Sequence, residues 1–366
     1  MRFTSTKEVL LKGIQGVQTV IDPKAVQPIL SHILIESKND NIVLTATDFN
    51  IGIVSILPIK PIMTGAITIP AKKILEIVKE LPDNETISVS VKKNNLVSIE
   101  CGKSLFKIMG LPEEEFSKPP EFKDKNNITL KQNKLKTMLR RTSFAIGHDE
   151  IRHVLNGILF VIKPTYLRLA ATDGRCLAVT EDKIQLPKTA ETKFILPAKA
   201  VDELDRMLAD SEEEIKLFLA EKQVSFDKGS KKLISRLIEG EFPNYEKVIP
   251  EEAKEKIVVA RAPLLAAIKR TALFTSHDSM FVKIDVSRDK ITLSKNDPHM
   301  GEARVELEAQ YKGKDISIGF NPDYLINLLK NIDEENIYME LVDPAKPGVV
   351  RIGDEYVYVV MPRQPS

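Results

Sequence analysis

The residues of this chain that could do chemistry include a short Gly-Lys-Ser run, which resembles part of a nucleotide-binding loop. Gly102-Lys103-Ser104 matches the end of a phosphate-binding loop, but the earlier glycine that such a loop requires is replaced by Val97. A strand pattern continues through this run, so a structural lysine in a strand is the favoured interpretation. The run therefore gives no evidence for nucleotide binding.

Aspartates and histidines are the other candidates for chemistry. Asp48 and Asp173 close matching Ala-Thr-Asp signals at an offset of 173 − 48 = 125, so they occupy equivalent places in two repeats. We expect each of them to hold the turn after its own strand, not to form a carboxylate pair. His148 and His153 are five positions apart, a spacing that does not put them on one helix face for a metal. With no HExxH, Gly-x-Ser-x-Gly or Cys–His cluster in the sequence, we predict a non-catalytic protein without metal or cofactor.

Composition sets wide bounds on the class of protein. The 366 residues are 43% hydrophobic, and 53 basic and 52 acidic side chains give a net charge of +1. Total charge therefore argues neither for nor against a nucleic-acid partner. Cys101 and Cys176 are too few for a disulfide framework and fit a reducing cytoplasm. No run approaches a membrane span, and the amino terminus lacks the apolar stretch of a signal peptide, so we expect a cytoplasmic protein.

The elements that carry these residues repeat along the chain. ILIESKNDNIVLTATDFNIGI at 33–53 is answered by ILFVIKPTYLRLAATDGRCLAV at 158–179. Further matches join 67–78 with 194–208, and a fainter third copy includes 282–293 and 316–329. Dividing 366 residues by three gives 122 for each copy. The sequence therefore predicts three divergent copies of one domain.

Each copy is predicted to contain two helices among antiparallel strands. Apolar residues at helical spacing predict first helices at 6–20, 131–144 and 263–274. Second helices are expected to start near Pro70, Pro197 and Pro322, because proline suits a first helical turn. Segregated helices and strands predict an α+β fold with both helices of a copy on the same sheet system. Pro-rich or charged connectors lead us to expect domains at 1–126, 127–254 and 255–366.

The first helix of the second copy is strongly basic. It carries five cations and no acid: Lys131, Lys134, Lys136, Arg140 and Arg141. Its counterparts in the other copies are also biased towards lysine and arginine. A basic lining in a chain with no Trp and 6% aromatic residues suits duplex phosphates better than stacked bases. The alternative, an ordinary solvated helix face, is weakened but not removed by the shared bias.

Seven short motifs follow one another along the chain. They are MRFT at the start, LNGILF at 155–160, AATDGRCLA at 170–178, LPAKA at 196–200, GEFPNYEKVIP at 240–250, IGFNPDYL at 318–325 and YVVMP at 358–362. In these motifs the chain resembles the family of the bacterial β sliding clamp, a subunit of DNA polymerase III. Each motif alone is weak. Together, on a threefold repeat of the right length, they are specific, and the likeness covers the chain from end to end.

The resemblance implies a six-domain ring made by two crescent-shaped protomers joined head to tail. Helices would line the hole and sheets would form the outside. Such a DNA sliding clamp encircles double-stranded DNA without sequence specificity and gives processivity to the replicative DNA polymerase. The implied partners are a second copy of the chain, the polymerase subunit, the clamp loader and other replication or repair proteins.

The resemblance also implies a cleft for partner peptides between the second and third domains. Its matched residues are Leu155, Thr172, Gly174, Arg175, Leu177, Pro243, Lys247, Val248, Tyr324, Val360, Met361 and Pro362. We expect Val360, Met361 and Pro362 to form an apolar edge, while ordinary core is the alternative for Leu155 and Leu177. Arg175-Cys176 replaces the family's usual His-Arg. The identity of the rim cation and the exposure of the thiol are therefore open, with a buried thiol favoured.

Two further sets of residues follow from the resemblance. The DNA-binding set is Lys24, His148, Arg152 and His153, together with the cations of the basic helix. The dimer interface set is Phe106 and Ile108 in the first copy with Leu273 and Phe274 in the third. Flanking ion pairs are expected from Lys103, Lys107, Glu302 and Glu306, where the match is looser.

Two functions from other classes stay open on the residues alone. A repeat scaffold that binds proteins without encircling DNA would not distinguish circular from linear duplex. A nucleotidyl or phosphate-hydrolysing enzyme with a dispersed site would show metal-dependent turnover.

Overall fold

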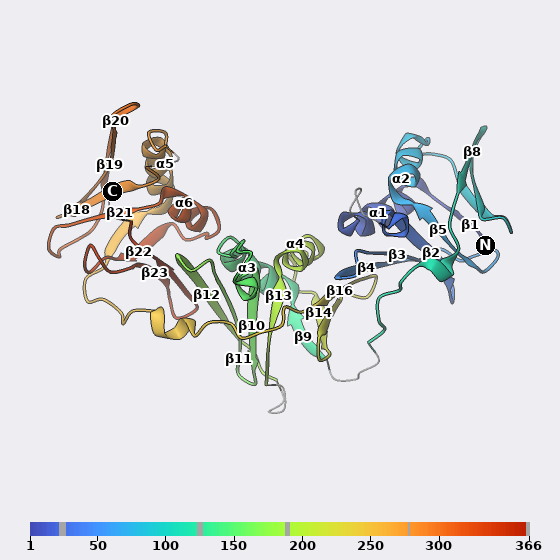
Figure 1. Ribbon diagram of the computed structural model, residues 1–366, viewed down its shortest axis with the longest axis horizontal. Helices are drawn as coiled ribbons and strands as arrows, with labels where there is room; N and C mark the ends of the chain where they lie inside the picture. Colours follow the sequence, from blue (N-terminus) through green and yellow to red (C-terminus); the bar gives the residue numbers. More distant parts are fainter. Residues whose placement is uncertain (22–26, 123–126, 187–190, 277–278, 364–366) are drawn as a thin grey trace. The chain divides into compact units, whose positions relative to one another are not determined.

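The protein folds into antiparallel sheets with helices packed on them. The computed structural model describes residues 1–21, 27–122, 127–186, 191–276 and 279–363 (Figure 1). Two compact units are formed, the first by Met1–Asn133 with Asp202–Leu237 and the second by Lys134–Val201 with Ile238–Ser366. The arrangement confirms the predicted α+β class.

The first helix of each copy lies close to its predicted position. These helices are α1 (Lys7–Val17), α3 (Gln132–Ser143) and α5 (Arg261–Ala272). Thr6 caps α1, because its side chain accepts a hydrogen bond from the Val9 N–H at 3.4 Å. Lys131, predicted in the second of these helices, is instead the last residue of a strand.

The second helices follow strands directly. They are α2 (Ala71–Glu80), α4 (Ala198–Met207) and α6 (Pro322–Lys330). Pro322 is the first residue of α6, as predicted, whereas Pro70 and Pro197 are the last residues of the strands that precede α2 and α4. Short 3-10 turns lie at Gln18–Val20, Pro28–Ser31, Glu113–Glu115, His153–Leu155 and Tyr245–Val248.

The first unit contains two antiparallel sheets. The smaller has the order β1 (Arg2–Ser5), β6 (Ile87–Val91), β7 (Leu96–Cys101), β8 (Ser104–Met109). The larger has the order β5 (Ala66–Pro70), β2 (His32–Lys38), β3 (Asn41–Thr47), β4 (Ile51–Leu57), β16 (Lys231–Arg236), β15 (Gln223–Asp227), β14 (Glu214–Leu219), β9 (Ile128–Lys131). Helix α1 packs on this larger sheet, where a Cβ at Gly13 would lie 2.7 Å from Leu57 and 3.0 Å from Leu44.

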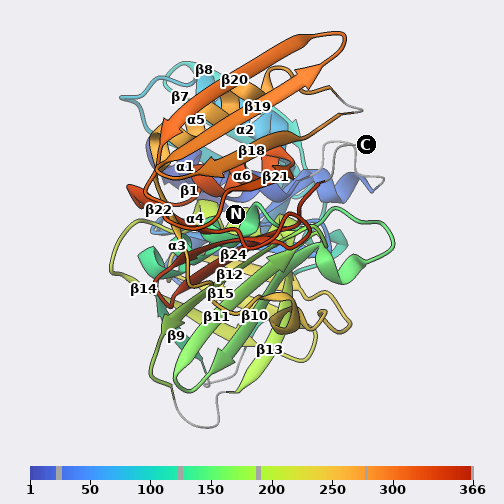
Figure 2. The same ribbon diagram turned by 90° about the vertical axis from the view of Figure 1, so that its left-hand side faces the viewer.

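The second unit repeats this arrangement. Its larger sheet has the order β13 (Thr192–Pro197), β10 (Gly157–Lys163), β11 (Tyr166–Thr172), β12 (Cys176–Lys183), β24 (Tyr356–Val360), β23 (Gly348–Ile352), β22 (Asn336–Glu340), β17 (Ile257–Ala260). Its smaller sheet has the order β20 (Gly301–Glu308), β19 (Lys290–Asp297), β18 (Val282–Ser287), β21 (Ile316–Phe320). Figure 2 shows the smaller sheet at the front, with α5 and α6 behind it.

Each large sheet joins strands from two successive sequence copies. In the first unit β4 pairs with β16, so that Ile51 lies opposite Ser235. In the second unit β12 pairs with β24, so that Cys176 lies opposite Val360. Backbone ladders therefore continue from one copy into the next, and the compact units divide the middle copy between them.

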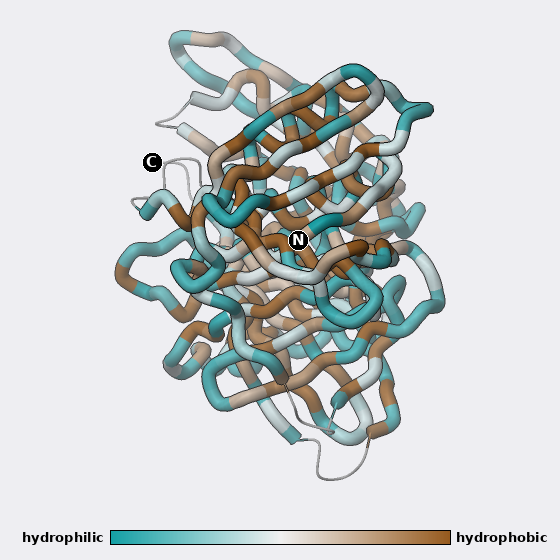
Figure 3. Tube along the Cα trace, turned by 90° about the vertical axis from the view of Figure 1, so that its right-hand side faces the viewer, coloured by the Kyte–Doolittle hydropathy of each residue, from teal (hydrophilic) through white to brown (hydrophobic). Residues whose placement is uncertain are grey.

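Alternating side chains of the strands and the buried faces of the helices form the hydrophobic core of each unit. Phe3, Leu10 and Ile14 are fully buried in the first unit. In the second, the rings of Phe160 and Phe194 stack with centroids 4.9 Å apart. Burying each such side chain stabilises the fold by roughly 1.5–3 kcal/mol. Figure 3 shows hydrophobic residues along the strands and hydrophilic residues gathered in the loops.

The Gly-Lys-Ser run is a hairpin turn, which corrects the expectation that the strand continues through it. Cys101 ends β7 and pairs with Ser104, the first residue of β8, leaving Gly102 and Lys103 in the turn. Gly102 has φ +55°, a left-handed conformation that glycine adopts without steric cost. Lys103 therefore lies in a hairpin turn. The element that follows is strand β8, not the helix whose N-terminus would bind a phosphate.

Candidate functional site

The turn at 172–176 is built by its own side chains. Oδ1 of Asp173 accepts hydrogen bonds from the backbone N–H groups of Arg175 and Cys176, at 2.7 and 2.8 Å. The Thr172 hydroxyl accepts from the Gly174 N–H at 3.0 Å and donates to the Cys176 carbonyl at 2.5 Å. Gly174 has φ +87°, which favours glycine. Gly174 and Arg175 are thereby held exposed at the tip of the turn, and the predicted structural role of Asp173 is confirmed.

Tyr324 ties this turn to helix α6. Its hydroxyl donates a 2.8 Å hydrogen bond to Oδ2 of Asp173. Burial, followed by the bond to Asp173 and its negative charge, raises the pKa of Tyr324 well above its ordinary value. The phenol is therefore neutral at physiological pH and remains a donor. Its backbone carbonyl accepts from the hydroxyl of Tyr358 at 3.1 Å, which links α6 to β24.

The C-terminal strand runs through the middle of the larger sheet of the second unit. β24 lies between β12 and β23, and its last residue, Val360, is only 2% exposed. The expectation that Val360 forms part of an open apolar edge is therefore wrong. The next residue, Met361, is 48% exposed and is fixed by its N–H, which donates to the Arg175 carbonyl at 2.9 Å. Pro362 is half-buried.

Leu155 and Leu177 belong to the core in the free chain. Leu155 is 1% exposed. Leu177 is 3% exposed and packs in a core cluster that includes Val359 and Tyr245. Of the predicted cleft residues in the connector, Val248 is apolar and 56% exposed. Its neighbour Lys247 is exposed too. Pro243 is exposed as well. The accessible apolar surface of the predicted cleft therefore rests on Val248, Met361 and the prolines.

Arg152 lies against the turn at 172–176, although the sequence assigned it to DNA. Its Nε pairs with Oδ2 of Asp149 at 2.8 Å, and its guanidinium donates to the Asp173 carbonyl at 3.3 Å. A Cβ at Gly174 would lie 2.7 Å from the same guanidinium. Hydrogen bonds from the Arg152 backbone and side chain, and from the Ile151 backbone, lower the pKa of Asp149 to about 2. Arg152 therefore places a cation beside the turn at 172–176, a position that sequence reasoning did not predict.

The thiol of Cys176 is buried. Its residue is 3% exposed, and burial raises the pKa of the thiol to about 12. The neutral, covered thiol is a poor nucleophile. The favoured prediction, a buried and inert cysteine, is confirmed. The other prediction, an accessible thiol beside the cleft, is wrong.

Four of the five cations predicted on the basic helix have acidic neighbours within their own units. In the first unit Lys131, at the end of β9, pairs with Glu212. In the second, Arg140 pairs with Asp333, and Arg141 pairs with Glu334 at 2.6 Å while lying over the Tyr356 ring. The Arg141 side chain is only 13% exposed, so it is poorly placed to reach a phosphate.

The remaining cations of the DNA set differ in exposure. Lys134 lies 3.8 Å from Asp182 and keeps 57% of its side chain exposed. His148 and His153 are exposed on the segment that carries Arg152. Lys24 lies outside the described residues. The described residues contain no group of three or more His, Cys, Asp or Glu side chains arranged for a metal ion. Nor do they contain a helix long and apolar enough to cross a membrane.

The predicted interface residues of the first copy lie on a free sheet edge. β8 ends the smaller sheet of the first unit, with Ile108 nearly buried and Phe106 half-buried. The opposite face of β8 exposes Leu105 and Met109 at 54% and 59%, which sequence reasoning missed.

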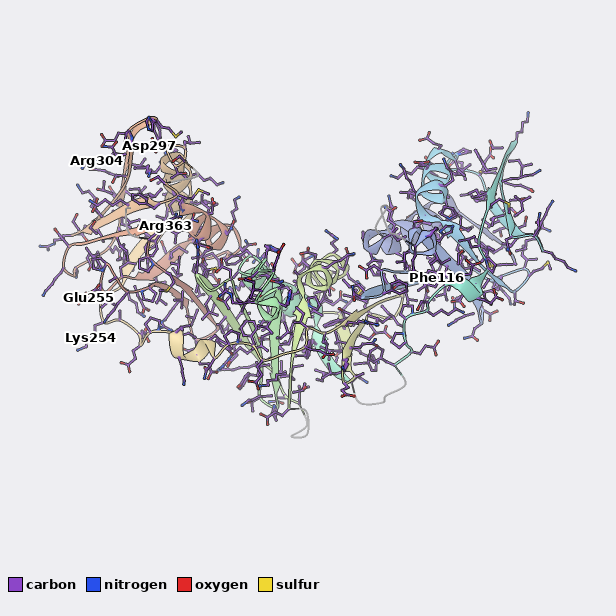
Figure 4. All side chains as sticks on the ribbon, viewed as in Figure 1. Phe116, Lys254, Glu255, Asp297, Arg304 and Arg363 are labelled. Carbon is purple, nitrogen blue, oxygen red and sulfur yellow. The ribbon has the colours of Figure 1, made fainter. Side chains whose placement is uncertain are left out.

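The third copy offers the other edge, β20. Leu273, directly after α5, is 71% exposed, and Phe274 is half-buried near Gly301 at the start of β20. Figure 4 labels Asp297 and Arg304 on the hairpin of β19 and β20. Glu306 on β20 already pairs with Arg304 at 2.9 Å and Lys290 at 3.5 Å within its own chain. Its predicted role in a flanking ion pair would require it to exchange partners.

Three family models match the chain in succession. They are the N-terminal domain of the DNA polymerase III beta subunit at residues 1–120, its central domain at 129–244 and its C-terminal domain at 246–364. Beta sliding clamps from Chlamydia pneumoniae and Pseudomonas aeruginosa are each 32% identical to this chain. The first aligns over 99% of this chain and 98% of its own length, and the second over 99% of both.

Solved structures agree in fold. The DNA polymerase sliding clamp from Bacillus subtilis superposes with a TM-score of 0.96 at 28% identity, covering 100% of both chains. The sliding clamp from Pseudomonas aeruginosa bound to griselimycin superposes with a TM-score of 0.95 at 31% identity, again over 100% of both. The chain therefore belongs to the bacterial β sliding clamp family, the DNA polymerase III beta subunits, which are non-catalytic processivity factors of DNA replication.

Proposed function

We propose that two copies of this chain close head to tail into a ring around duplex DNA and tether replication proteins to it in the bacterial cytoplasm. The full-length match to three successive clamp domains is the observation that carries this proposal. A head-to-tail interface joins two different surfaces and produces a closed ring when the rotation divides the circle. Enclosure, not affinity, then keeps the protein on DNA.

The two free sheet edges support the proposed seam. β8 and β20 are the outer strands of the small sheets, and an exposed edge is a natural template for pairing with another chain. Leu105, Met109 and Leu273 expose large apolar side chains that an interface would bury. In the proposed dimer, β8 of one protomer lies beside β20 of its partner, with Phe106, Ile108 and Phe274 behind the contact.

Sequence-independent contacts with phosphates are proposed for the cations. The DNA-binding role implied by the family is kept for Lys24, His148, His153, Lys131, Lys134, Lys136 and Arg140. Arg152 and Arg141 are weaker members, because one lies against the turn at 172–176 and the other is covered by Glu334 and Tyr356. Acidic neighbours on several of these cations favour weak binding that falls with salt, which suits sliding.

Partner peptides are proposed to bind around the turn at 172–176. The exposed Val248 and Met361 provide apolar contacts, while Arg152, Arg175 and Lys247 provide cations at the rim. Methionine adapts its shape, which suits a surface that serves the polymerase, the loader and other replication or repair proteins in turn. Leu155, Leu177 and Val360 lie in the core beneath and become available only if the peptide displaces what covers them.

Retention on circular DNA tests the proposal. A purified clamp loaded on a nicked circle is expected to stay bound through a salt wash and to be lost when the circle is linearised. Equal loss from circular and linear DNA would favour a protein-binding scaffold that does not encircle DNA.

A further inference from the structure

The chain between β16 and β17 presents two residues of the proposed partner site, Lys247 and Val248. Both are exposed, and they end the 3-10 turn Tyr245–Val248 (Figure 1, in yellow). Tyr245, at the start of the turn, is buried in the core cluster that contains Leu177 and Val359. The turn is therefore covered at one end and open at the other. The contacts that fix its covered end determine where Val248 lies.

The backbone of the turn is only weakly closed by itself. The Glu246 carbonyl accepts a hydrogen bond from the Ile249 N–H at 3.3 Å, a bond that spans Lys247 and Val248. This distance is longer than that of an ordinary backbone hydrogen bond, and short 3-10 turns have poor hydrogen-bond geometry. Segment 245–250 therefore depends on neighbouring strands to keep one conformation.

Arg168 of β11 holds the beginning of this segment. Its Nη1 donates a hydrogen bond to Oε1 of Glu246 at 2.7 Å. Burial raises the pKa of the Tyr245 phenol, while a hydrogen bond from Arg168 and its positive charge act in the opposite direction. One guanidinium therefore contacts both the buried ring and the exposed carboxylate of two adjacent residues.

The guanidinium of Arg168 is itself fixed by strand residues. Its Nε and Nη2 contact Oε2 of Glu181 at 2.8 and 2.7 Å, across the paired strands β11 and β12. Its central carbon lies 4.9 Å from the centroid of the Tyr166 ring. An arginine oriented in this way loses little further freedom when it binds Glu246. It therefore acts as a fixed support for the segment.

Arg351 of β23 holds the other end of the segment. Its Nη2 donates to the Pro250 carbonyl at 2.6 Å, and its Nε donates to Oε1 of Glu340 at 3.1 Å. Glu340 is buried, so this end is anchored to the core of the unit. Val248 lies midway between the two arginine contacts. Loss of Arg168 would release the beginning of the segment while Arg351 still held its end.

The first copy has apolar residues in the place of the Arg168–Glu181 pair. Arg168 corresponds to Val43, since 168 − 43 = 125, and Glu181 corresponds to Ile56, since 181 − 56 = 125. Val43 and Ile56 lie opposite each other in their own sheet, as Arg168 and Glu181 do. A sheet of the same order therefore forms without an ion pair at this position. The pair is found in the unit that carries the turn assigned to partner binding.

We infer that Arg168 is a positioning residue of the partner site, which holds segment 245–250 so that Val248 is in place for a bound peptide. This role rests on the proposed partner site, and Arg168 lies outside the residue set that the family resemblance implies. A segment that is already ordered loses less conformational entropy when a ligand binds. Loosening the segment should therefore lower peptide affinity although every contact residue is kept.

Hydrogen exchange of the full-length protein tests whether Arg168 orders the segment. Exchange of the backbone amides at 245–250 is followed by mass spectrometry in the parent and in Arg168→Ala. We expect exchange in this segment to become about fivefold faster or more, because a hydrogen bond to a charged group is lost. Strands β11 and β12 should keep the exchange rates of the parent.

A double-mutant cycle tests whether this order matters for binding. The probe is a labelled short peptide of leucine and aspartate, which suits the apolar side chains and the cations of the site, and binding is measured by fluorescence anisotropy. We expect Val248→Ala to weaken binding about fivefold in the parent and less than about twofold in Arg168→Ala, because a displaced Val248 no longer contacts the peptide. An arginine with only a structural role would leave the effect of Val248→Ala unchanged.

Two further variants complete the experiment. Glu246→Ala removes the exposed carboxylate and leaves Arg168 with Glu181, so it keeps the test possible if Arg168→Ala does not fold. It should change exchange and coupling in the same direction. Lys283→Ala is the control, because it breaks another ion pair of the second unit, with Asp285 at 2.9 Å. It should keep both the exchange of segment 245–250 and the effect of Val248→Ala found in the parent.

The outcomes separate this inference from the proposed function. Faster exchange in Arg168→Ala or Glu246→Ala, with a smaller effect of Val248→Ala in the same background, would support the positioning role. Exchange at the parent rate in both variants, or an undiminished effect of Val248→Ala, would overturn it. Probe binding that does not depend on Val248, or no binding to the parent, would contradict the partner site itself and the positioning role with it. Retention on circular DNA is untouched by any of these results.

Discussion

The hydroxyl of Tyr324 donates a 2.8 Å hydrogen bond to the carboxylate of Asp173, joining the helix of the third sequence copy to a turn of the second. The other oxygen of Asp173 holds the backbone of that turn. The first copy has the same turn around Asp48. The Tyr324–Asp173 bond therefore marks the turn that we assign to partner binding.

Removing this hydroxyl is expected to weaken partner binding. Tyr324→Phe leaves one Asp173 oxygen without its donor, at a cost of about 0.5–1.5 kcal/mol, or roughly two- to tenfold in affinity if the turn loosens. Titration with a partner peptide measures the effect. Tyr311→Phe is the matched control, because the Tyr311 hydroxyl bonds to the Lys314 carbonyl away from this turn. Equal affinities for both variants and the parent would contradict a role for the bond.

Exposed and buried members of the predicted cleft should respond differently to mutation. Val248→Ala with Met361→Ala should reduce peptide affinity while leaving the free energy of unfolding nearly unchanged, because both side chains are about half exposed. Leu177→Ala should instead lower the stability by roughly 2–5 kcal/mol, because it opens a cavity in the core. Peptide titration and urea unfolding of each variant measure the two effects. A stable Leu177→Ala protein, or full peptide affinity in the double variant, would contradict the assignment.

The sequence predicted elements whose signals are local. The helical spacing of apolar residues predicted a helix at 6–20, where α1 lies, and Pro322 predicted the start of α6. The role of Asp173 followed from the short-range turn chemistry of aspartate. The family resemblance supplied the cleft residues, and Arg175 and Met361 among them are exposed as a binding surface requires.

Features that depend on distant segments could not be predicted in this way. The burial of Val360 follows from its place between β12 and β23, and no local pattern announces that pairing. In β8, residues on both faces are apolar, so the sequence could not say that Leu105 and Met109 are the exposed ones. The packing of Arg152 on the turn at 172–176 is likewise a contact between separate segments.

The exposed apolar residues near the two free sheet edges should control dimerisation. Leu273→Ala with Phe274→Ala, or Leu105→Asp with Met109→Asp, is expected to convert the dimer into monomers, since apolar contacts and a paired edge are lost. Sedimentation velocity over a range of concentrations measures the change. Met63→Ala, at an equally exposed methionine of the first unit, is the control and should remain dimeric. An unchanged dimer in both interface variants would place the seam elsewhere.

The buried thiol should make the fold sensitive to alkaline pH. Burial raises the pKa of Cys176 from 9.0 to about 12, so the folded state favours the neutral thiol. The contribution of the neutral thiol to the free energy of unfolding is fully present below pH 9. It is lost as pH rises towards 12, by up to about 4 kcal/mol. Urea unfolding at pH 8 and near pH 11 should therefore show a smaller loss of stability in Cys176→Ala than in the parent. Parallel losses in the two proteins would mean that the thiol titrates normally.

Enclosure of DNA is the central claim, and retention on a nicked circle measures it most directly. The clamp is loaded, washed at a salt concentration that removes protein from linear duplex, and followed after a single cut in the circle. We predict that the protein stays on the intact circle with no sequence preference and leaves the cut DNA by sliding off its ends. The double variant Leu273→Ala with Phe274→Ala should be retained neither on the intact circle nor on the cut DNA. Protein that leaves intact and cut DNA at the same rate would contradict the account.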